Sequence, residues 1–378
     1  MKHNHLKTAV LLGLAMSLSS YSAGMAAEIT GPIVADKTQI YQEDVTITNG
    51  NSDHAAIQIG HKDNETDTPD LDAEVNISTE KGHNIMIDSK GYGIRTENAS
   101  TGTIQLNSSG NNVIQFGSGS GISADSKVGI TLSAAGTNSI TYKGNSSGDA
   151  ETDDYDGINA GVTNTGDIAL IGDTNTIAVG GSGSDGIYTA AGSPSDVALT
   201  AEEESNTITA GNNGIDHRGS GTVKLQAANG GNLITAGEGQ TTPEGDGVRI
   251  EGNGKVVLTG QYNTISAADD GLYIKETSGE NASISVTASG ANENTGVGNY
   301  IEGNRGIAAE AGAIDVIGMN TVIEANKTGI EGTNGNIAVV DTETGETPAA
   351  DSQLQITVDS EDAAYGIYRH GMTEGNSQ

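Results

Sequence analysis

A short motif of apolar and polar positions recurs along the chain, and it has three parts. The first part is an asparagine followed one or two positions later by an aliphatic residue, and it begins at Asn84, Asn112, Asn138, Asn175, Asn206, Asn232, Asn263, Asn299 and Asn320. The second part is a glycine followed directly by an aliphatic residue, at Gly93, Gly121, Gly157, Gly186, Gly214, Gly247, Gly271, Gly306, Gly329 and Gly366. The third part is an alternating aliphatic pair, from Ile104 with Leu106 to Ile337 with Val339.

This motif predicts short β-strands joined by turns. Alternation with a period of two is a strand signal, and Ile, Val and Thr favour extended backbone. The Gly, Asn, Asp and Ser residues between the apolar runs favour turns. Successive motifs begin 21 to 37 residues apart, which is the repeat length of solenoids. We therefore expect an all-β solenoid of about ten coils, with three short strands in each coil.

Stacking of the coils is what we expect to stabilise them. One unit carries only a few inward aliphatic residues, too few for a core of its own, so neighbouring units must share one. Placing equivalent strands side by side in parallel gives a parallel β-helix, in which Ile lies over Ile. The repeated asparagines suit turns and can hydrogen-bond to one another along the stack. We expect the repeated glycines to adopt a backbone angle that a Cβ atom would forbid.

The composition fits a thin core repeated many times. The chain has no Trp, one Phe and no Cys, while 55 of its 378 residues are Gly. The formal net charge is −33, from 50 acidic and 17 basic residues, so a general nucleic-acid binder is excluded. The same charge disfavours adsorption to anionic lipid and favours a soluble, self-repelling surface.

The first 27 residues have the three parts of a secretory signal peptide. Lys2 and Lys7 lie in a basic start, residues 9–18 form an apolar run, and small residues at 23–27 offer a cleavage site. The apolar run is too short to span a bilayer, which takes about 20 residues. We expect residues 1–27 to be removed on export and residues 28–378 to form the repeat region.

Three longer polar segments interrupt the repeat and are expected to project from it as loops. They span residues 144–156, 237–246 and 341–352 and are rich in Gly, Asp and Thr. Loops of this kind often carry function in solenoids.

Calcium is the one cofactor that the sequence raises. Residues 180–188 (GGSGSDGIY) fit a nonapeptide that binds calcium between tandem copies, but only one clean copy exists. An aspartate also precedes the glycine-aliphatic step at Asp156, Asp185, Asp246 and Asp270, and clustered carboxylates suit calcium. The alternative interpretation is an ordinary polar turn, and otherwise we expect no cofactor.

Other candidate chemistry stays weak. Residues 144–148 match the G-x-S-x-G nucleophile motif without the helix that it needs. The pairs at 153–154 and 269–270 are adjacent aspartates, such as polysaccharide-cleaving enzymes use, with a histidine at His370. The histidines lack metal-ligand spacing, and we expect all of them on the surface: His54, His61, His83, His217 and His370. Five tyrosines can form a sparse carbohydrate-stacking surface or simply pack: Tyr155, Tyr188, Tyr262, Tyr273 and Tyr300. We expect no enzyme.

The signal peptide, the lack of Cys and the tandem units together resemble the passenger domains of bacterial autotransporters, over roughly residues 40–360. The resemblance implies a right-handed, single-stranded parallel β-helix in an adhesin-like protein of a Gram-negative envelope. It also implies export through a C-terminal outer-membrane barrel. No barrel follows residue 369, and the last unit has no recognisable cap, so we expect a fragment or a protein whose anchor lies elsewhere.

These observations favour a structural and adhesive protein that displays loops at the cell surface or outside the cell. The expected partner is a host-cell or extracellular-matrix protein or a glycan, with no nucleic acid, and with a membrane only through a barrel that this chain lacks. The alternatives are a polysaccharide-active β-helix enzyme, similar to pectin lyases or polygalacturonases, and a calcium-stiffened surface-layer element.

Overall fold

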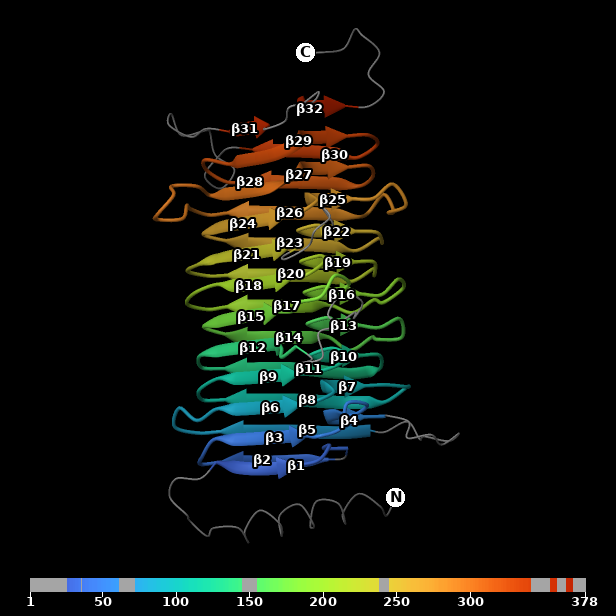
Figure 1. The fold of residues 1–378 in the computed structure, drawn as a ribbon, viewed down its shortest axis with the longest axis vertical. Helices are drawn as coiled ribbons and strands as arrows, with labels where there is room; N and C mark the ends of the chain where they lie inside the picture. The colour runs from blue at the N-terminus through green and yellow to red at the C-terminus, as the bar shows by residue number, and fades with distance from the viewer. Residues whose placement is uncertain are drawn as a thin grey trace, which may run out of the picture.

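A computed structural model gives the fold of the protein, and it describes residues 26–34, 36–60, 72–144, 155–237, 245–340, 354–358 and 365–369. Three strands recur along the coils, and we name them by their sequence signature. In the first coil an isolated bridge at Ile33 takes the place of the second strand, and in the last described coil only β31 and β32 are present. All pairings between neighbouring coils are parallel, so the expected parallel β-helix is confirmed. Figure 1 shows the coils stacked from the blue N-terminal end to the red C-terminal end as a rod. Within the described ranges, no helix is long and apolar enough to cross a bilayer.

The asparagine strands stand at the position of the first part of the motif, and those from β9 to β27 carry its asparagine. They are β1 (Ala27–Thr30), β3 (Val45–Asn49), β6 (Ile85–Ser89), β9 (Asn112–Phe116), β12 (Thr137–Tyr142), β15 (Thr174–Ala178), β18 (Asn206–Ala210), β21 (Gly231–Ala236), β24 (Tyr262–Ala267), the first halves of β27 (Asn299–Ala309) and β29 (Val322–Gly332), and β31 (Gln355–Val358).

The glycine strands follow in each coil and carry the glycine-aliphatic step. They are β4 (Ala55–Ile59), β7 (Tyr92–Thr96), β10 (Ile122–Ala124), β13 (Ile158–Ala160), β16 (Ile187–Thr189), β19 (Ile215–His217), β22 (Val248–Ile250), β25 (Asp270–Ile274), the second halves of β27 and β29, and β32 (Tyr365–Arg369). Because β27 and β29 run through both positions, the asparagine and glycine strands join into one 21-stranded sheet.

The alternating strands close every described coil except the last, that of β31 and β32, and form a separate sheet of 11 strands. They are β2 (Lys37–Tyr41), β5 (Asp72–Thr79), β8 (Thr101–Ser108), β11 (Lys127–Ala134), β14 (Ile168–Gly172), β17 (Val197–Ala201), β20 (Thr222–Ala227), β23 (Lys255–Gly260), β26 (Ser283–Ala288), β28 (Ala313–Ile317) and β30 (Asn336–Val340).

The core is a set of aliphatic columns that run the length of the rod. One coil contributes Ile208, Ile215, Val223 and Leu225, all with no exposed surface. In the next coil their register partners are Ile234, Val248, Val256 and Leu258. Full burial of each such side chain contributes on the order of 1.5–3 kcal/mol. Since a coil buries its apolar faces only against its neighbours, stability is a sum over coil-to-coil contacts.

A ladder of seven asparagines runs beside the aliphatic columns. The Nδ2 atom of each donates to the Oδ1 atom of the next, over 2.8 to 2.9 Å, through Asn112, Asn138, Asn175, Asn206, Asn232, Asn263 and Asn299. The second Nδ2 hydrogen often reaches a carbonyl near the end of an alternating strand, as Asn206 does to Gln226 over 3.0 Å. The ladder therefore ties the two sheets together at a buried corner.

Asn84 and Asn320 lie outside this ladder, contrary to the repeat that we assigned from the sequence. The register places Ile85 beneath Asn112 and Thr321 above Asn299. Asn84 instead accepts a hydrogen bond from the backbone of Asn111, and Asn320 has a positive φ of 51° in a turn. Both asparagines precede the ladder position by one residue. Because Ile85 cannot donate, the Oδ1 atom of Asn112 has no hydrogen-bond partner.

The repeated glycines are required by space, and the backbone angle that we expected is wrong. None of the ten adopts a positive φ. A Cβ atom on Gly214 would instead overlap the Cγ2 atom of Ile234 and the carbonyl oxygen of Gly247 in the next coil. The same two contacts recur along the rod: one with the Cγ2 atom of an isoleucine on the asparagine strand of the next coil, and one with the carbonyl oxygen of the repeat glycine in that coil. They are found at Gly93, Gly121, Gly157, Gly186, Gly247, Gly271, Gly306 and Gly329. Gly366, in the last coil, has no atom within 4 Å of this position.

We expect Gly214→Ala to lower the melting temperature, because the added methyl group must push two coils apart. The cost of such overpacking is about 1–3 kcal/mol. Gly366→Ala is the matched control and should leave the melting temperature of the isolated rod unchanged. Thermal unfolding followed by circular dichroism checks both, and equal melting temperatures for the two variants would contradict the account.

Candidate functional site: the outer face of the glycine strands

An outward column on the glycine strands carries charged and aromatic side chains on successive coils. Tyr188, Asp216, Arg249 and Tyr273 are register partners on β16, β19, β22 and β25. The buried aliphatic residues beside them point inward, so strand alternation turns these four side chains outward. A second column, at the strand ends, adds Arg218, Glu251 and Lys275. With Arg305 from β27, we call these eight residues the Arg–Tyr strip.

The strip concentrates the cations of a strongly acidic chain. Three of the five arginines of the sequence lie in it, although acidic residues outnumber basic ones by 50 to 17. Each arginine lies over a tyrosine ring: Arg218 over Tyr188 at 5.3 Å, and Arg249 and Arg305 over Tyr273 at 6.0 and 4.9 Å. Such cation–π contacts hold both partners in place.

Carboxylates pair with the cations of the strip. Arg218 donates two hydrogen bonds to Oδ2 of Asp216, at 3.0 and 2.7 Å. Glu251 forms ion pairs with Arg249 and Lys275. Hydrogen bonding to Asp216 raises the pKa of Arg218 further above its usual range, so its charge is permanent.

Two polar atoms at the centre of the strip have no hydrogen-bond partner. They are Oδ1 of Asp216, whose side chain is fully buried, and Nε of Arg249 on the next coil. One is an acceptor and the other a donor, on neighbouring strands. Buried polar groups are nearly always satisfied, so each of these two atoms is open to a further hydrogen-bond partner, a donor for Asp216 and an acceptor for Arg249.

The four aspartates that the sequence raised for calcium stand in one column beside the strip. Oδ1 of Asp156 accepts from the backbone N–H of Asp185, at 3.0 Å, and Oδ1 of Asp246 accepts from that of Asp270, also at 3.0 Å. Between these pairs, Asn213 donates to Asp185 and accepts from Asp246. The column therefore supports the turn into each glycine strand.

Only Asp246 and Asp270 of these four come close enough to Asp269 to share a cation. Their carboxylate oxygens lie within 4.8 Å of one another. Arg305 already binds both oxygens of Asp270, and Asn304 donates to Asp269 at 3.1 Å. The adjacent pair at 269–270 is thus tied to neighbouring side chains, while the pair at 153–154 and His370 lie outside the described residues.

Burial raises the pKa of several carboxyls in the column. Desolvation, followed by repulsion from Asp270, raises the pKa of Asp246 to about 7. Desolvation is also the largest cause of the raised pKa of Asp185 and of Asp270. Stacked, buried carboxyls one coil apart hold protons more tightly than free ones.

His217 is buried, so the expectation that all five histidines lie on the surface is wrong. Its Nδ1 atom contacts the hydroxyl of Thr189, and its Nε2 atom bonds to the carbonyl of Gly221 at 2.9 Å. Since a carbonyl only accepts, Nε2 carries the proton, and Nδ1 accepts from Thr189. Desolvation lowers the pKa of His217, which keeps the ring neutral. His61 lies outside the described residues.

The tyrosines that we considered as one surface fall into separate groups. Only Tyr188 and Tyr273 belong to the strip. Tyr155 packs on Tyr142 with ring centroids 4.9 Å apart, and Tyr300 donates to Glu324 at 2.8 Å. The ring of Tyr262 lies over Gly231.

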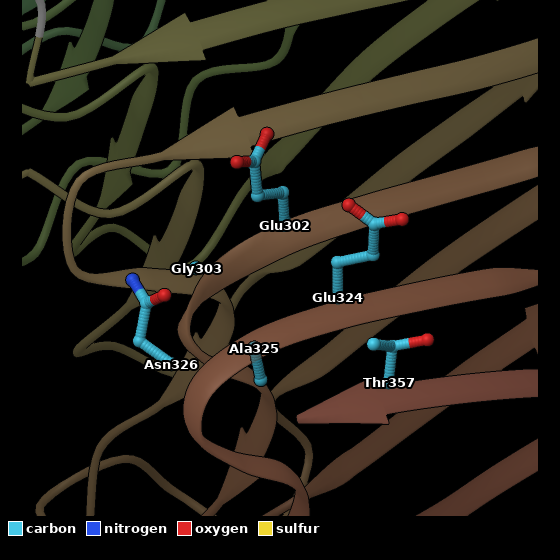
Figure 2. Close-up of a pocket in the computed structure, with 6 residues that line it drawn as sticks. All are labelled: Glu302, Gly303, Glu324, Ala325, Asn326 and Thr357. Carbon is cyan, nitrogen blue, oxygen red and sulfur yellow. The ribbon is translucent and has the colours of Figure 1, made fainter. Parts of the chain in front are cut away.

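A shallow hollow lies near the C-terminal end, on the asparagine strands. It has a volume of about 240 Å³ and is lined by Glu302, Gly303, Glu324, Ala325, Asn326 and Thr357. Figure 2 shows Glu302, Glu324 and Thr357 on three successive strands. The hollow lies where β27 and β29 shift register, between Gly303 and Arg305. Ser266 donates to Glu302 at 2.8 Å, so both carboxylates accept hydrogen bonds from neutral side chains.

Sequence reasoning missed the strip, although its signal is present. The residue that follows each glycine-aliphatic step points outward, because strand residues alternate between the two faces. In four successive coils these residues are Tyr188, Asp216, Arg249 and Tyr273. Comparing these positions down the repeat would have found them. The three loops that we expected to carry function lie largely outside the described residues.

We expect Asp246→Asn to stabilise the rod at pH 8, on the order of 2 kcal/mol, and to have little effect at pH 4. The pKa of Asp246 is raised, so its contribution is favourable below its unfolded pKa and is lost as pH rises through about 7. Asn213 already occupies the same column, so an amide fits. The measurement is urea unfolding at both pH values, with the exposed Asp315→Asn as control. A variant less stable than wild type at pH 8 would contradict this.

We also expect millimolar calcium to leave the melting temperature unchanged. A ligand that binds only the folded state must raise it, but the guanidinium of Arg305 already neutralises Asp270. Calorimetry with calcium and with EDTA tests this, and a rise of several degrees with calcium would show that the acidic cluster binds the ion.

No family model, no curated protein and no solved structure matches this chain.

Proposed function

We propose that this chain is an exported, adhesive rod of a bacterial cell surface, similar in role to an autotransporter passenger domain, and that the Arg–Tyr strip binds a glycan. The predicted signal peptide supports export. The confirmed parallel β-helix supports a display role, because its core consists of repeated columns that leave the outward positions free to vary.

The observation that carries the glycan proposal is the unsatisfied pair in the strip. A sugar hydroxyl both donates and accepts, so the hydroxyls of a bound glycan would supply the partners that these atoms lack: a donor for Oδ1 of Asp216 and an acceptor for Nε of Arg249. Access requires an arginine to rotate, and the side chains of Arg218 and Arg249 are 38% and 26% exposed. Glu251 and Lys275 beside them offer further acceptors and donors for neighbouring hydroxyls.

Binding is better supported than catalysis at these carboxylates. A general acid or base must be able to exchange a proton with the substrate. Asp216 and Asp270 are instead each held by an arginine through two hydrogen bonds. We therefore propose that these groups position a ligand and do not cleave it.

Glycan-array and matrix-protein binding by the exported, purified chain tests this function. We expect Arg249→Ala to weaken binding to the best glycan at least tenfold, because it removes the unsatisfied donor. Lys224→Ala is the matched control: it removes an exposed cation from β20, on the other sheet, and should bind as wild type does. Binding that is equally strong in Arg249→Ala would exclude the strip, and a panel without any ligand would count against adhesion.

A further inference from the structure

Two arginines of the Arg–Tyr strip are held by buried aspartates. Arg218 donates two hydrogen bonds to Oδ2 of Asp216, and Arg305 donates to both carboxylate oxygens of Asp270. The side chains of these aspartates are 0% and 2% exposed. An anionic ligand that drew either arginine away would leave a buried carboxylate without its cation, and breaking a buried pair in this way is costly. These two arginines are therefore bound to their carboxylates.

A third carboxylate, that of Glu251, is shared by the other cations of the strip. Its Oε1 atom lies 3.0 Å from Nζ of Lys275 and also pairs with Arg249, while its Oε2 atom lies 4.0 Å from Nε of Arg218. A carboxylate oxygen of Asp246 lies 3.7 Å from Nη1 of Arg249 as well. Every cation of the strip thus has a carboxylate within ion-pair distance.

The balance of charge over the strip is negative. Within the described part of the chain, six carboxylates form ion pairs with its four cations: Asp216, Asp246, Glu251, Asp270, Glu310 and Glu331. Four positive and six negative charges leave −2 when all six carboxyls are ionised. The balance is −1 when Asp246, whose pKa burial raises to about 7, holds its proton. Despite its arginines, the strip repels an anionic ligand, as does the rest of a chain with a net charge of −33.

The two unpartnered atoms at the centre of the strip select the same class of ligand. Oδ1 of Asp216 needs a donated hydrogen, which a sulfate or an ionised carboxylate does not carry. Nε of Arg249 needs an acceptor. The hydroxyl and amide groups of neutral sugars supply both kinds of partner. A neutral glycan therefore satisfies both atoms without disturbing the ion pairs of Arg218 and Arg305.

The strip is long enough for more than one sugar unit. Its residues lie on β16, β19, β22, β25 and β27, so it crosses four coil-to-coil steps, about 19 Å at the usual strand spacing (Figure 1). The unpartnered atoms lie on β19 and β22, with Tyr188 one coil to one side and Tyr273 one coil to the other. A sugar bound at the centre can thus be followed by further units along the rod.

We propose that the ligand of the strip is a neutral oligosaccharide of several units that lies along the rod axis, and that sulfated and acidic glycans are rejected. This inference rests on the proposed glycan binding and specifies its ligand. The carboxylate of Glu251 is central to the rejection of anions, because its single charge is shared among three cations.

Sodium sulfate probes the charge of the strip without any glycan. The chain has five arginines, so their side-chain N–H signals can be followed by nuclear magnetic resonance at an ionic strength held constant with sodium chloride. We expect no saturable shift of the Arg249 signal in wild type and a saturable shift in Glu251→Gln, which keeps the shape and removes the charge. Glu202→Gln, which removes an exposed carboxylate from a turn, is the matched control and should behave as wild type does. Saturable sulfate binding at Arg249 of wild type would overturn the proposal.

Calorimetric titration with neutral oligosaccharides of increasing length, and with their sulfated derivatives, tests the ligand itself. We expect the affinity for the neutral series to rise at least tenfold from the monosaccharide to the longer members and to change less than twofold with added salt, since no ligand charge is screened. In Glu251→Gln the preference for the neutral over the sulfated form should fall at least tenfold. A wild-type preference for the sulfated form would overturn this inference and leave glycan binding in place, whereas a chain that binds no glycan would contradict both proposals.

Discussion

The structure depends on one steric constraint, the fit of an isoleucine methyl group into the space above a glycine of the preceding coil. At Gly214 the neighbouring atoms are Cγ2 of Ile234 and the carbonyl oxygen of Gly247, and the same fit recurs along the rod. It fixes the register of the glycine and asparagine strands relative to each other. Once these strands are in register, the aliphatic columns close, and the asparagine ladder can form beside them.

Register also determines what the outside of the rod can do. Parallel strands in register bring every third strand of the sequence to one face, so residues far apart in the chain become neighbours. The Arg–Tyr strip arises in this way from Tyr188, Asp216, Arg249 and Tyr273. The buried aspartate column arises likewise, and burial there raises the pKa of Asp246. The regular core thus leaves outward positions free to carry specific chemistry.

The architecture could be predicted well from the sequence, because the core positions of a parallel β-helix recur in the sequence as a repeat. The three strands of each coil could be read from Asn206, Gly214 and Val223 with Leu225. The register at the two ends of the asparagine ladder could not be read in this way. Asn84 and Asn320 each stand one residue before the ladder position, which Ile85 and Thr321 occupy. The reason for the glycine repeat was also missed. A Cβ atom at these positions would clash with the next coil, and such a contact between coils cannot be inferred from local backbone preferences.

The candidate site was harder to predict than the fold. Single residues such as Arg249 and His217 have no local signature, and their meaning depends on which residue the register places beside them. From the sequence, the aspartates before the glycine-aliphatic steps were the candidates for a calcium site. In the structure, Asp156 and Asp185 instead accept backbone hydrogen bonds that hold the turns together.

Spin-label distances along one outward column test the register most directly. The chain has no cysteine, so single labels can be placed by substitution at Gln105, Lys224 and Asp315, which lie in one column of the alternating strands. Four coils separate the first two positions and seven separate the outer two, so we predict backbone separations of about 19 and 34 Å. Narrow distance distributions in that ratio would support the stacked columns, and distances that do not scale with the number of coils would contradict them.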